Sequence, residues 1–334
     1  MSERQSGLDI LRCLALLFVV TFHSFLNNGY YYEPQNGYAM WLAGSFRWLS
    51  VSCIGLFLLL TGYLKSNQTE IGRCWRGLLP VLAGYLLAAV ISIPVRYFLL
   101  GDRQTLGVWI TRLFGFQGVY YGWYVEMYVG LVLLTPFLNR LLERLDTKGL
   151  LLFAGGLLVL TALPGATSLV ILPDYWRGYY PVTYYVLGAV IRRMQPKIHP
   201  AASLCGAAAM ALLLGAVTVL STDGQLSEAA VWEFPDIWIT VISVLLFLSF
   251  YRWKLSAWAA KLAAWGAGGC YGGYLLSHLL DAWCYHLAPQ WKNPQGYGKL
   301  FFLITVPIFL VSVAAGRLLE KIIPGRIQRK VVVR

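Results

Sequence analysis

The chain has 334 residues, of which 58% are hydrophobic and 13% are charged, and its formal net charge is +12. An average soluble domain carries about a quarter charged residues, so one water-soluble core could not bury this much apolar surface. The composition therefore excludes an ordinary soluble domain. Because the basic residues stand at the ends of apolar segments, membrane topology explains the positive charge better than nucleic-acid binding does.

Apolar runs of roughly 20 residues, the length needed to cross a hydrocarbon core about 30 Å thick, recur along the chain. The first run is too long for the core of a signal peptide, lacks a small-residue cleavage site and contains a histidine, so we interpret it as a retained helix. The predicted helices span residues 8–26, 41–64, 78–98, 122–142, 149–165, 178–194, 203–220, 235–251, 265–287 and 299–319. We expect an all-α, polytopic membrane bundle of about ten transmembrane helices, forming a single domain over residues 1–334 without an appended soluble domain.

The 27 lysines and arginines divide unequally between the two sets of helix ends. With the N-terminus on the cytoplasmic side, the outer ends receive only Arg47, Arg96, Arg103, Arg112, Arg177, Lys292 and Lys299. An excess of basic residues on one side is the pattern typical of cytoplasmic loops. It predicts that both termini lie in the cytoplasm.

Aromatic residues are concentrated at the predicted outer boundary of the membrane. They include Tyr30, Tyr31, Tyr32, Tyr120, Tyr121, Trp123, Tyr124, Trp176, Tyr179 and Tyr180. A belt of aromatic rings at the membrane surface is the ordinary explanation. The alternative is that some of these rings form a surface on which a sugar stacks, because sugars present apolar C–H faces.

The six cysteines are spread singly along the chain, without a C-x-x-C motif or a His/Cys cluster at metal-ligand spacing. We therefore expect neither disulfides nor a metal site.

The first predicted helix carries two ionisable side chains, Arg12 and His23. Such residues within a span are costly, so each is a functional hypothesis by default. Eleven residues apart, they lie on nearly one face and about 16 Å apart along the helix axis. An extended pantetheine arm has a comparable reach, so a phosphate-bearing head group near Arg12 could place its thioester close to His23. Alternatively, Arg12 pairs with Asp9 and anchors the helix at the interface.

Further polar residues are predicted at the depth of His23. Glu126, one turn into the predicted helix 122–142, could orient an imidazole as an acid partner, or it could pair with an interfacial arginine. His278 and Asp281, one turn apart in the predicted helix 265–287, could form a second acid/base pair, bind an acceptor or make a helix–helix hydrogen bond.

Arg73 and Arg76 precede Pro80 on the predicted cytoplasmic side. Two guanidinium groups one turn apart suit a diphosphate or a ribose phosphate, which they can bind bidentately. Retention of the loop in the cytoplasm with contacts to anionic lipid is the simpler explanation of this pair taken alone.

Taken together, these positions resemble the acyltransferase 3 family of integral-membrane acyltransferases, which O-acylate bacterial glycans and cell-wall polymers. Residues 7–23 are similar to its first-helix signature, an arginine followed by ten residues and a histidine. Later elements that resemble the family are Phe57 with Thr61-Gly62-Tyr63, Arg73-Cys74-Trp75-Arg76 with Pro80, Trp123-Tyr124 with Pro136, and Gly273 with His278. The sequence departs from the last motif, because the aromatic residue expected two places after Gly273 is Leu275 and a tyrosine stands one place earlier.

The resemblance implies a multi-pass protein of the bacterial cytoplasmic membrane that transfers an acyl group from acyl-CoA, usually acetyl-CoA. The acceptor would be a hydroxyl of a glycan, a lipid-linked sugar or a cell-wall polymer. Carried over to this sequence, Arg12, Arg73 and Arg76 become donor-binding candidates and His23 the catalytic residue. Glu126 and His278 are secondary catalytic candidates.

Two mechanisms and two other classes of function remain open from the sequence. His23 could act as a general base on the acceptor hydroxyl, or as a transient acyl carrier that would give ping-pong kinetics. A secondary transporter or exporter would also bury polar residues, although the chain lacks the paired broken segments typical of transporters. A membrane sensor that binds a ligand without turnover is the other alternative.

Overall fold

The computed structural model describes residues 5–163, 173–221, 235–293, 295–296 and 301–322. All regular elements in these ranges are helical, which confirms the predicted all-α fold. The α-helices are α1 (Ser6–Asn27), α2 (Gly37–Val51), α3 (Cys53–Lys65), α4 (Ile71–Arg76), α5 (Leu79–Phe98), α6 (Leu106–Phe114), α7 (Trp123–Arg144), α8 (Thr147–Thr161), α9 (Tyr180–Met194), α10 (Pro200–Ser221), α11 (Ile237–Phe250), α12 (Ala257–Leu287) and α14 (Val306–Ile322). Short 3-10 turns cover Tyr30–Tyr32, Asp174–Tyr179 and Pro289–Trp291, and a π-helical turn, Phe301–Thr305, precedes α14.

Each predicted helix has a counterpart, but three features differ from the prediction. The predicted helix 41–64 is divided at Ser52, whose hydroxyl donates to the Leu49 carbonyl oxygen at 2.6 Å and so competes with regular helical bonding. The helix α12 begins at Ala257, earlier than predicted, and the short helices α4 and α6 were not predicted. The ends of the predicted helices at 164–165 and 299–300 lie outside the described residues.

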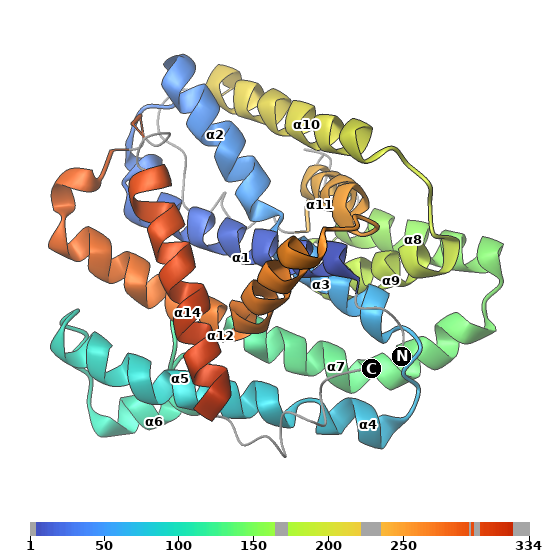
Figure 1. Ribbon diagram of the computed structural model, residues 1–334, viewed down its shortest axis with the longest axis horizontal. Coiled ribbons are helices and arrows are strands. Elements are labelled where there is room, and N and C mark those ends of the chain that lie inside the picture. Colours follow the sequence, from blue (N-terminus) through green and yellow to red (C-terminus); the bar gives the residue numbers. More distant parts are fainter. Residues whose placement is uncertain (1–4, 164–172, 222–234, 294, 297–300, 323–334) are drawn as a thin grey trace.

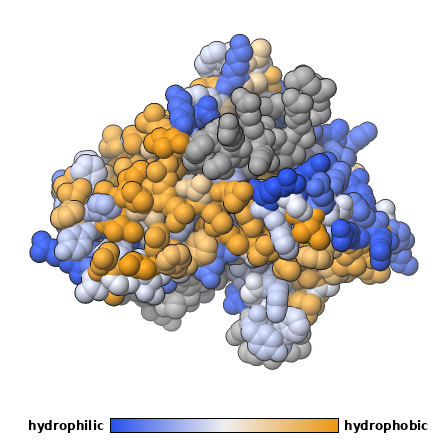
Figure 2. Space-filling model, turned by 90° about the horizontal axis from the view of Figure 1, so that it is seen from below, coloured by the Kyte–Doolittle hydropathy of each residue, from blue (hydrophilic) through white to orange (hydrophobic). Residues whose placement is uncertain are grey.

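Within the described residues, six stretches are long and apolar enough to cross a membrane, and α8 and α11 are shorter apolar helices. The six are Ser6–Asn27, Gly37–Lys65, Ile71–Phe98, Trp123–Arg144, Pro200–Ser221 and Phe301–Ile322. Figure 2 shows apolar residues forming a broad band across one face of the molecule, with hydrophilic residues towards its ends. Such a surface suits a bilayer, in which only helices with internally satisfied backbones can span.

The helix α1 occupies the middle of the bundle (Figure 1). It packs against α2, α3, α11, α12 and α14. In Figure 1 the beginning of α1 and the end of α7 lie towards the right, and the connection between α5 and α6 lies at the left. These three places agree with the inner and outer sides predicted from charge.

Glycines let several helices meet backbone to backbone. A Cβ atom on Gly62 of α3 would overlap the Tyr185 carbonyl oxygen of α9, and one on Gly188 would overlap the Leu59 carbonyl oxygen of α3. The same holds between α14 and α12, where a Cβ on Gly316 would overlap the Gly269 carbonyl oxygen. Membrane helices use small residues in this way because close backbone approach supplies van der Waals contact that the hydrophobic effect cannot supply in lipid.

Candidate active site

His23 lies in the outer half of α1 and is 5% exposed. Its ring stacks on Tyr121 with centroids 4.6 Å apart and an interplanar angle of 18°. It also meets the edge of His278, with centroids 4.8 Å apart. The two histidines, which lie far apart in the sequence, are therefore neighbours because α1 packs against α12.

His278 completes a compact cluster of rings. Its imidazole makes edge contacts with Tyr120 and Tyr121, each with centroids 4.7 Å apart. Edge-to-face packing of this kind holds aromatic rings in defined orientations. We call His23, His278, Tyr120 and Tyr121 the histidine cluster.

Three buried polar atoms at the histidine cluster have no hydrogen-bond partner among the described residues: Nδ1 of His23, Nδ1 of His278 and Oδ1 of Asp281. The other carboxylate oxygen of Asp281 accepts a hydrogen bond from the Asn27 amide at 2.6 Å. Most buried polar groups in proteins are paired, so unpaired atoms in a group call for an explanation. A ligand hydroxyl, which both donates and accepts hydrogen bonds, is one group that can pair with atoms of these kinds.

The tyrosines of the histidine cluster come from a loop, residues 115–122, with unusual backbone geometry. Phe116 and Tyr121 have φ angles of 55° and 56°, in the left-handed region that residues other than glycine rarely adopt. The Tyr274 hydroxyl donates to the Tyr121 carbonyl oxygen at 2.5 Å, and the Tyr85 hydroxyl accepts from the Gly118 amide at 3.1 Å. Backbone strain of this type persists only where the surroundings impose it, and it is frequent at functional sites.

Arg96, at the end of α5, fastens the same loop from the outer side. Its guanidinium lies between the rings of Trp109 and Tyr120, 4.9 and 4.3 Å from their centroids. It donates to the Gln117 carbonyl oxygen at 2.9 Å and to Asp102 at 2.6 Å. Arg96 is only 6% exposed, so these contacts are shielded from water and the loop is held firmly.

Asp102 joins two arginines at the outer end of the bundle. Arg96 and Arg112 both pair with this carboxylate, at 2.6 and 2.9 Å. Burial raises the pKa of Asp102, but hydrogen bonds from Arg96 and Gln104 and the charges of the two arginines outweigh it, so the pKa lies below its usual value. The carboxylate therefore stays ionised and the ion cluster stays intact at neutral pH.

The Arg96→Gln variant is expected to loosen residues 115–122, because it removes the hydrogen bond to Gln117 and the cation between two rings. A hydrogen bond from a charged group contributes about 1.5–3 kcal/mol, so amide hydrogen exchange in this loop should become about tenfold faster or more. Arg112→Gln is the control, since it removes a cation from the same carboxylate without touching the Gln117 carbonyl oxygen. Equal exchange rates in the two variants would contradict this role of Arg96.

At the inner end of α1, Arg12 pairs with Asp9 at 2.6 Å, as the alternative interpretation of the sequence expected. Asp9 is buried, whereas the Arg12 side chain is 31% exposed. Arginine has five N–H donors, and this contact uses the Nη1 group alone. Pairing with Asp9 is therefore compatible with binding of a further anion by Arg12.

Arg73 and Arg76 lie on α4, on the surface of the molecule. Both contact Glu70, at 3.2 and 3.6 Å, and all three side chains are more than half exposed. Exposed ion pairs contribute little to stability, so the two guanidinium groups can exchange this partner for a phosphate at small cost.

Glu126 is not part of the histidine cluster. Its side chain is exposed on α7, whereas Val125 and Val132 of the same helix are buried. Counting residues along the helix gives the depth of Glu126 in the membrane. It does not give the face of the helix on which Glu126 lies, because α7 is apolar on nearly all sides. Its predicted catalytic role stays a prediction that the exposed position does not support.

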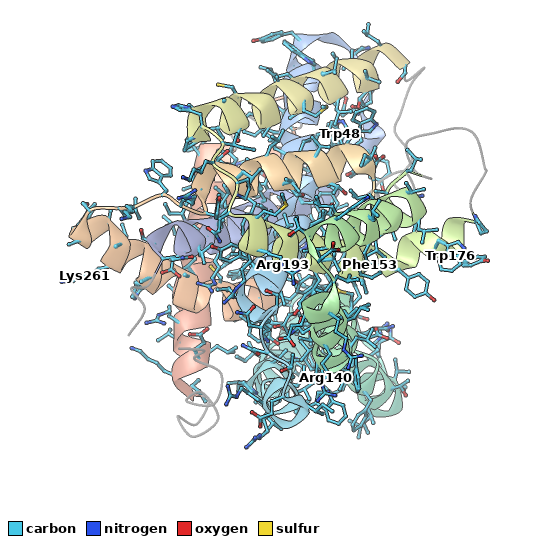
Figure 3. All side chains as sticks on the ribbon, turned by 90° about the vertical axis from the view of Figure 1, so that its right-hand side faces the viewer. Trp48, Arg140, Phe153, Trp176, Arg193 and Lys261 are labelled. Carbon is cyan, nitrogen blue, oxygen red and sulfur yellow. The ribbon has the colours of Figure 1, made fainter. Side chains whose placement is uncertain are left out.

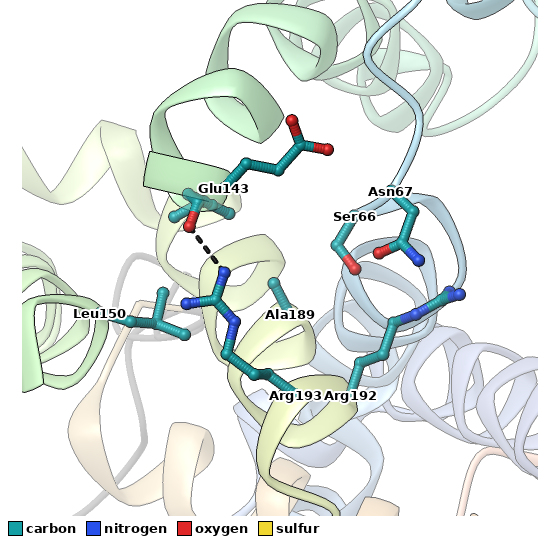
Figure 4. A pocket seen from close by; sticks show the side chains of 8 residues that line it. Ser66, Asn67, Glu143, Leu150, Ala189, Arg192 and Arg193 are labelled. Carbon is teal, nitrogen blue, oxygen red and sulfur yellow. Dashed lines mark hydrogen bonds between the residues drawn. The ribbon is translucent and has the colours of Figure 1, made fainter. Parts of the chain in front are cut away.

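A small pocket of about 230 Å³ opens between the ends of α3, α7 and α9. Arg192 and Arg193 extend to opposite sides of it, with Ser66, Asn67 and Glu143 around them (Figure 4). Figure 3 shows Arg193 and Arg140 on the same side of the molecule. This is the side predicted to face the cytoplasm.

The two arginines of this pocket bind the terminal carbonyl groups of neighbouring helices. Arg192 donates to the carbonyl oxygens of Tyr63 and Leu64 at 2.7 and 3.1 Å, and Arg193 donates to that of Leu142 at 2.7 Å. The last carbonyl groups of a helix lack partners within the helix, and cationic side chains satisfy them well. We therefore assign these arginines a structural role.

In the sequence, Arg96 and Lys65 were counted among the basic residues at helix ends that indicate membrane orientation. Neither was predicted to lie at the site. Arg96 lies one turn after Ser92 on a helix face that is otherwise apolar, and its burial depends on the later residues Trp109 and Tyr120. No spacing in the sequence reveals such a contact. Tyr120 and Tyr121 were noted as aromatic, but a place beside the histidines could not be separated from a membrane belt.

The fold and the histidine cluster define a helical membrane protein with a buried polar site between its central helices. The family model described as "Acyltransferase domain" matches residues 5–317, nearly the whole chain. The chain belongs to this acyltransferase 3 family, as its motifs predicted. Comparisons with curated proteins and with solved structures gave no match.

Proposed function

We propose that this membrane acyltransferase is an O-acyltransferase, in the simplest case an O-acetyltransferase, of the bacterial cytoplasmic membrane. It takes an acyl group from acyl-CoA on the cytoplasmic side. It transfers the group to a hydroxyl of an extracytoplasmic or lipid-linked glycan or cell-wall acceptor. The observation that supports this proposal is the meeting of His23 and His278 in the outer half of the bundle, on helices whose inner ends carry basic residues.

In the proposed reaction His23, as the neutral imidazole, removes the proton from the acceptor hydroxyl. The hydroxyl oxygen forms a bond to the thioester carbonyl carbon, the carbon–sulfur bond breaks, and the proton passes to the departing thiolate. His278 and Asp281, with their unpaired Nδ1 and Oδ1 atoms, orient the acceptor hydroxyl. A variant in which His23 carries the acyl group for a time uses the same residues.

Stacking of His23 on Tyr121 supports the role of His23 as the base, because the contact restrains the plane of the ring. A general base must be held within hydrogen-bond reach of the proton that it removes. The fastened loop 115–122 supplies this restraint through Tyr121.

The donor head group is proposed to bind to Arg12, Arg73 and Arg76. The Arg73→Ala/Arg76→Ala variant is expected to raise the Kd for CoA about tenfold or more, because each guanidinium lost removes a charge-assisted hydrogen bond to phosphate. Arg12→Ala should have an effect of the same size. Calorimetry with detergent-purified protein measures both.

The matched control is Arg140→Ala/Arg144→Ala, which removes two equally exposed arginines from the same predicted side of the membrane. This variant should bind CoA as the wild type does. If both double variants lose the same affinity, net charge rather than a specific site attracts the donor.

The proposed function is tested by thiol release from acetyl-CoA by the purified wild type, with and without a bacterial lipid-linked glycan fraction. Acceptor-dependent thiol release and label transfer from the acyl group to the glycan would support it. If the protein neither binds CoA nor releases thiol with the acceptor present, the acyl-CoA donor is wrong.

A further inference from the structure

Lys65, the last residue of α3, directs its ammonium group into the bundle. Its carbonyl oxygen accepts a hydrogen bond from Asn139 at 2.7 Å, whereas its ammonium donates to the Tyr128 hydroxyl at 3.0 Å. Asn139 and Tyr128 are eleven residues apart on α7, about 16 Å along the axis. A lysine at the end of a membrane helix usually extends towards water, and this side chain extends the opposite way.

The usual structural reasons for a lysine at a helix end do not account for this orientation. A cation there commonly satisfies the last carbonyl groups. Here Arg192 already donates to the carbonyl oxygens of Tyr63 and Leu64, and Asn139 donates to that of Lys65. Nor does a carboxylate in the described part of the chain lie within ion-pair distance of Lys65, although its ammonium is part-buried and buried charges are usually paired.

A continuous column of tyrosines leads from Lys65 to the histidine cluster. The ammonium lies 5.4 Å from the centroid of the Tyr128 ring, which stacks on Tyr124 with centroids 6.3 Å apart. Tyr124 meets the edge of Tyr274 at 5.5 Å, and the Tyr274 hydroxyl donates to the backbone of Tyr121. Tyr121 in turn stacks on His23. We call Tyr128, Tyr124 and Tyr274 the tyrosine column.

The inner end of the tyrosine column is close to the predicted donor-binding helix. Cys74, which lies between Arg73 and Arg76 on α4, donates to the Gln68 carbonyl oxygen at 3.3 Å. Asn139, which donates to the Lys65 carbonyl oxygen, donates to the same Gln68 oxygen at 2.8 Å. Lys65 therefore stands between exposed arginines at the surface and the buried histidines. A donor that enters past α4 meets this cation before it reaches His23.

We propose that Lys65 binds a phosphate group of the acyl-CoA donor and that the thioester-bearing arm lies along the tyrosine column. This inference rests on the proposed function and deepens it. An ammonium is a compact charge that suits a phosphate oxygen. Asn139 and Arg192 fix the end of α3, so the cation is held in place before the donor arrives.

The test compares two ligands that share the arm but differ in phosphate. CoA carries phosphates, and S-acetylpantetheine carries none. Lys65→Gln is expected to raise the Kd for CoA at least tenfold and to leave the Kd for S-acetylpantetheine within about twofold of the wild type. Lys65→Arg should recover most of the CoA affinity, because it restores the charge.

Lys148→Gln is the matched control, since it removes an exposed lysine from the same predicted side of the membrane. It should bind both ligands as the wild type does. Unchanged binding of S-acetylpantetheine also shows that the Lys65→Gln variant is folded. A variant that binds both ligands equally weakly, or both as the wild type does, overturns the inference.

A second measurement uses the wild type and needs no variant. CoA should slow the modification of Lys65 by a small amine-reactive reagent, followed by mass spectrometry, and should leave the modification of Lys148 unchanged. If CoA does not protect Lys65 in protein that releases thiol from acetyl-CoA, this inference fails and the proposed function stands. If the protein neither binds CoA nor releases thiol, both fail.

Discussion

The His23→Gln variant is expected to lower kcat for acyl transfer by about 10³-fold or more, because a positioned general base contributes about 10²–10⁴-fold and the carrier mechanism would lose still more. Glutamine fills much of the imidazole volume, so packing against Tyr121 and His278 is disturbed little. The CoA affinity should stay within about twofold of the wild type, since the residues proposed to bind phosphate lie towards the opposite end of α1. Thiol release and calorimetry on the same preparation measure both quantities.

The control for this variant is His286→Gln, which changes an exposed histidine near the end of α12. It should transfer acyl groups at the rate of the wild type. If His23→Gln retained more than about a tenth of the wild-type kcat, His23 could be neither base nor carrier, because either role contributes more than this. A variant that lost kcat and CoA affinity together would instead indicate that the substitution also displaces the residues proposed to bind the donor.

The second large effect concerns stability. Gly62→Ala is expected to destabilise the protein by about 3 kcal/mol, the upper end for overpacking in a close-packed interior. The added Cβ would overlap the Tyr185 carbonyl oxygen, which is backbone and cannot turn away as a side chain could. The helices α3 and α9 must separate, and the reciprocal contact of Gly188 with the Leu59 carbonyl oxygen is lost with it.

Gly130→Ala is the matched control, because it makes the same change inside α7 where a Cβ would meet no other atom within 4 Å. Alanine favours the helix over glycine by about 1 kcal/mol, so the control should be as stable as the wild type or slightly more stable. Thermal unfolding in detergent compares the two. Equal melting temperatures would show that α3 and α9 can part without cost.

Much of the fold could be predicted from the sequence because a bilayer imposes simple rules. Long apolar runs bounded by charges identified the helices, and the asymmetry of those charges predicts their direction in the membrane. The division at Ser52 could not be foreseen, because a single serine in an apolar run is usually tolerated. The short helices α4 and α6 were missed because neither is long enough to cross the membrane.

The site was predictable in part, and the limit is a physical one. Depth follows from counting residues, so His23 and His278 were placed at one level, where they do meet. The face of a helix follows from hydrophobic periodicity, which is weak when lipid makes the outside as apolar as the inside. For that reason the sequence did not show that the Glu126 side chain is exposed, and it did not show that the Lys65 ammonium extends towards Tyr128.

The ion pairs described above stand at the two ends of the bundle, Asp9 with Arg12 inside and Asp102 with Arg96 and Arg112 outside. In the proposed reaction the phosphates stay with the inner group, and only an acyl group passes outwards while a proton passes inwards. Moving one elementary charge through 100 mV involves about 2.3 kcal/mol, but this exchange carries no net charge. The membrane potential would then neither drive nor oppose the acylation of the acceptor. The free energy of the reaction would come from cleavage of the thioester alone.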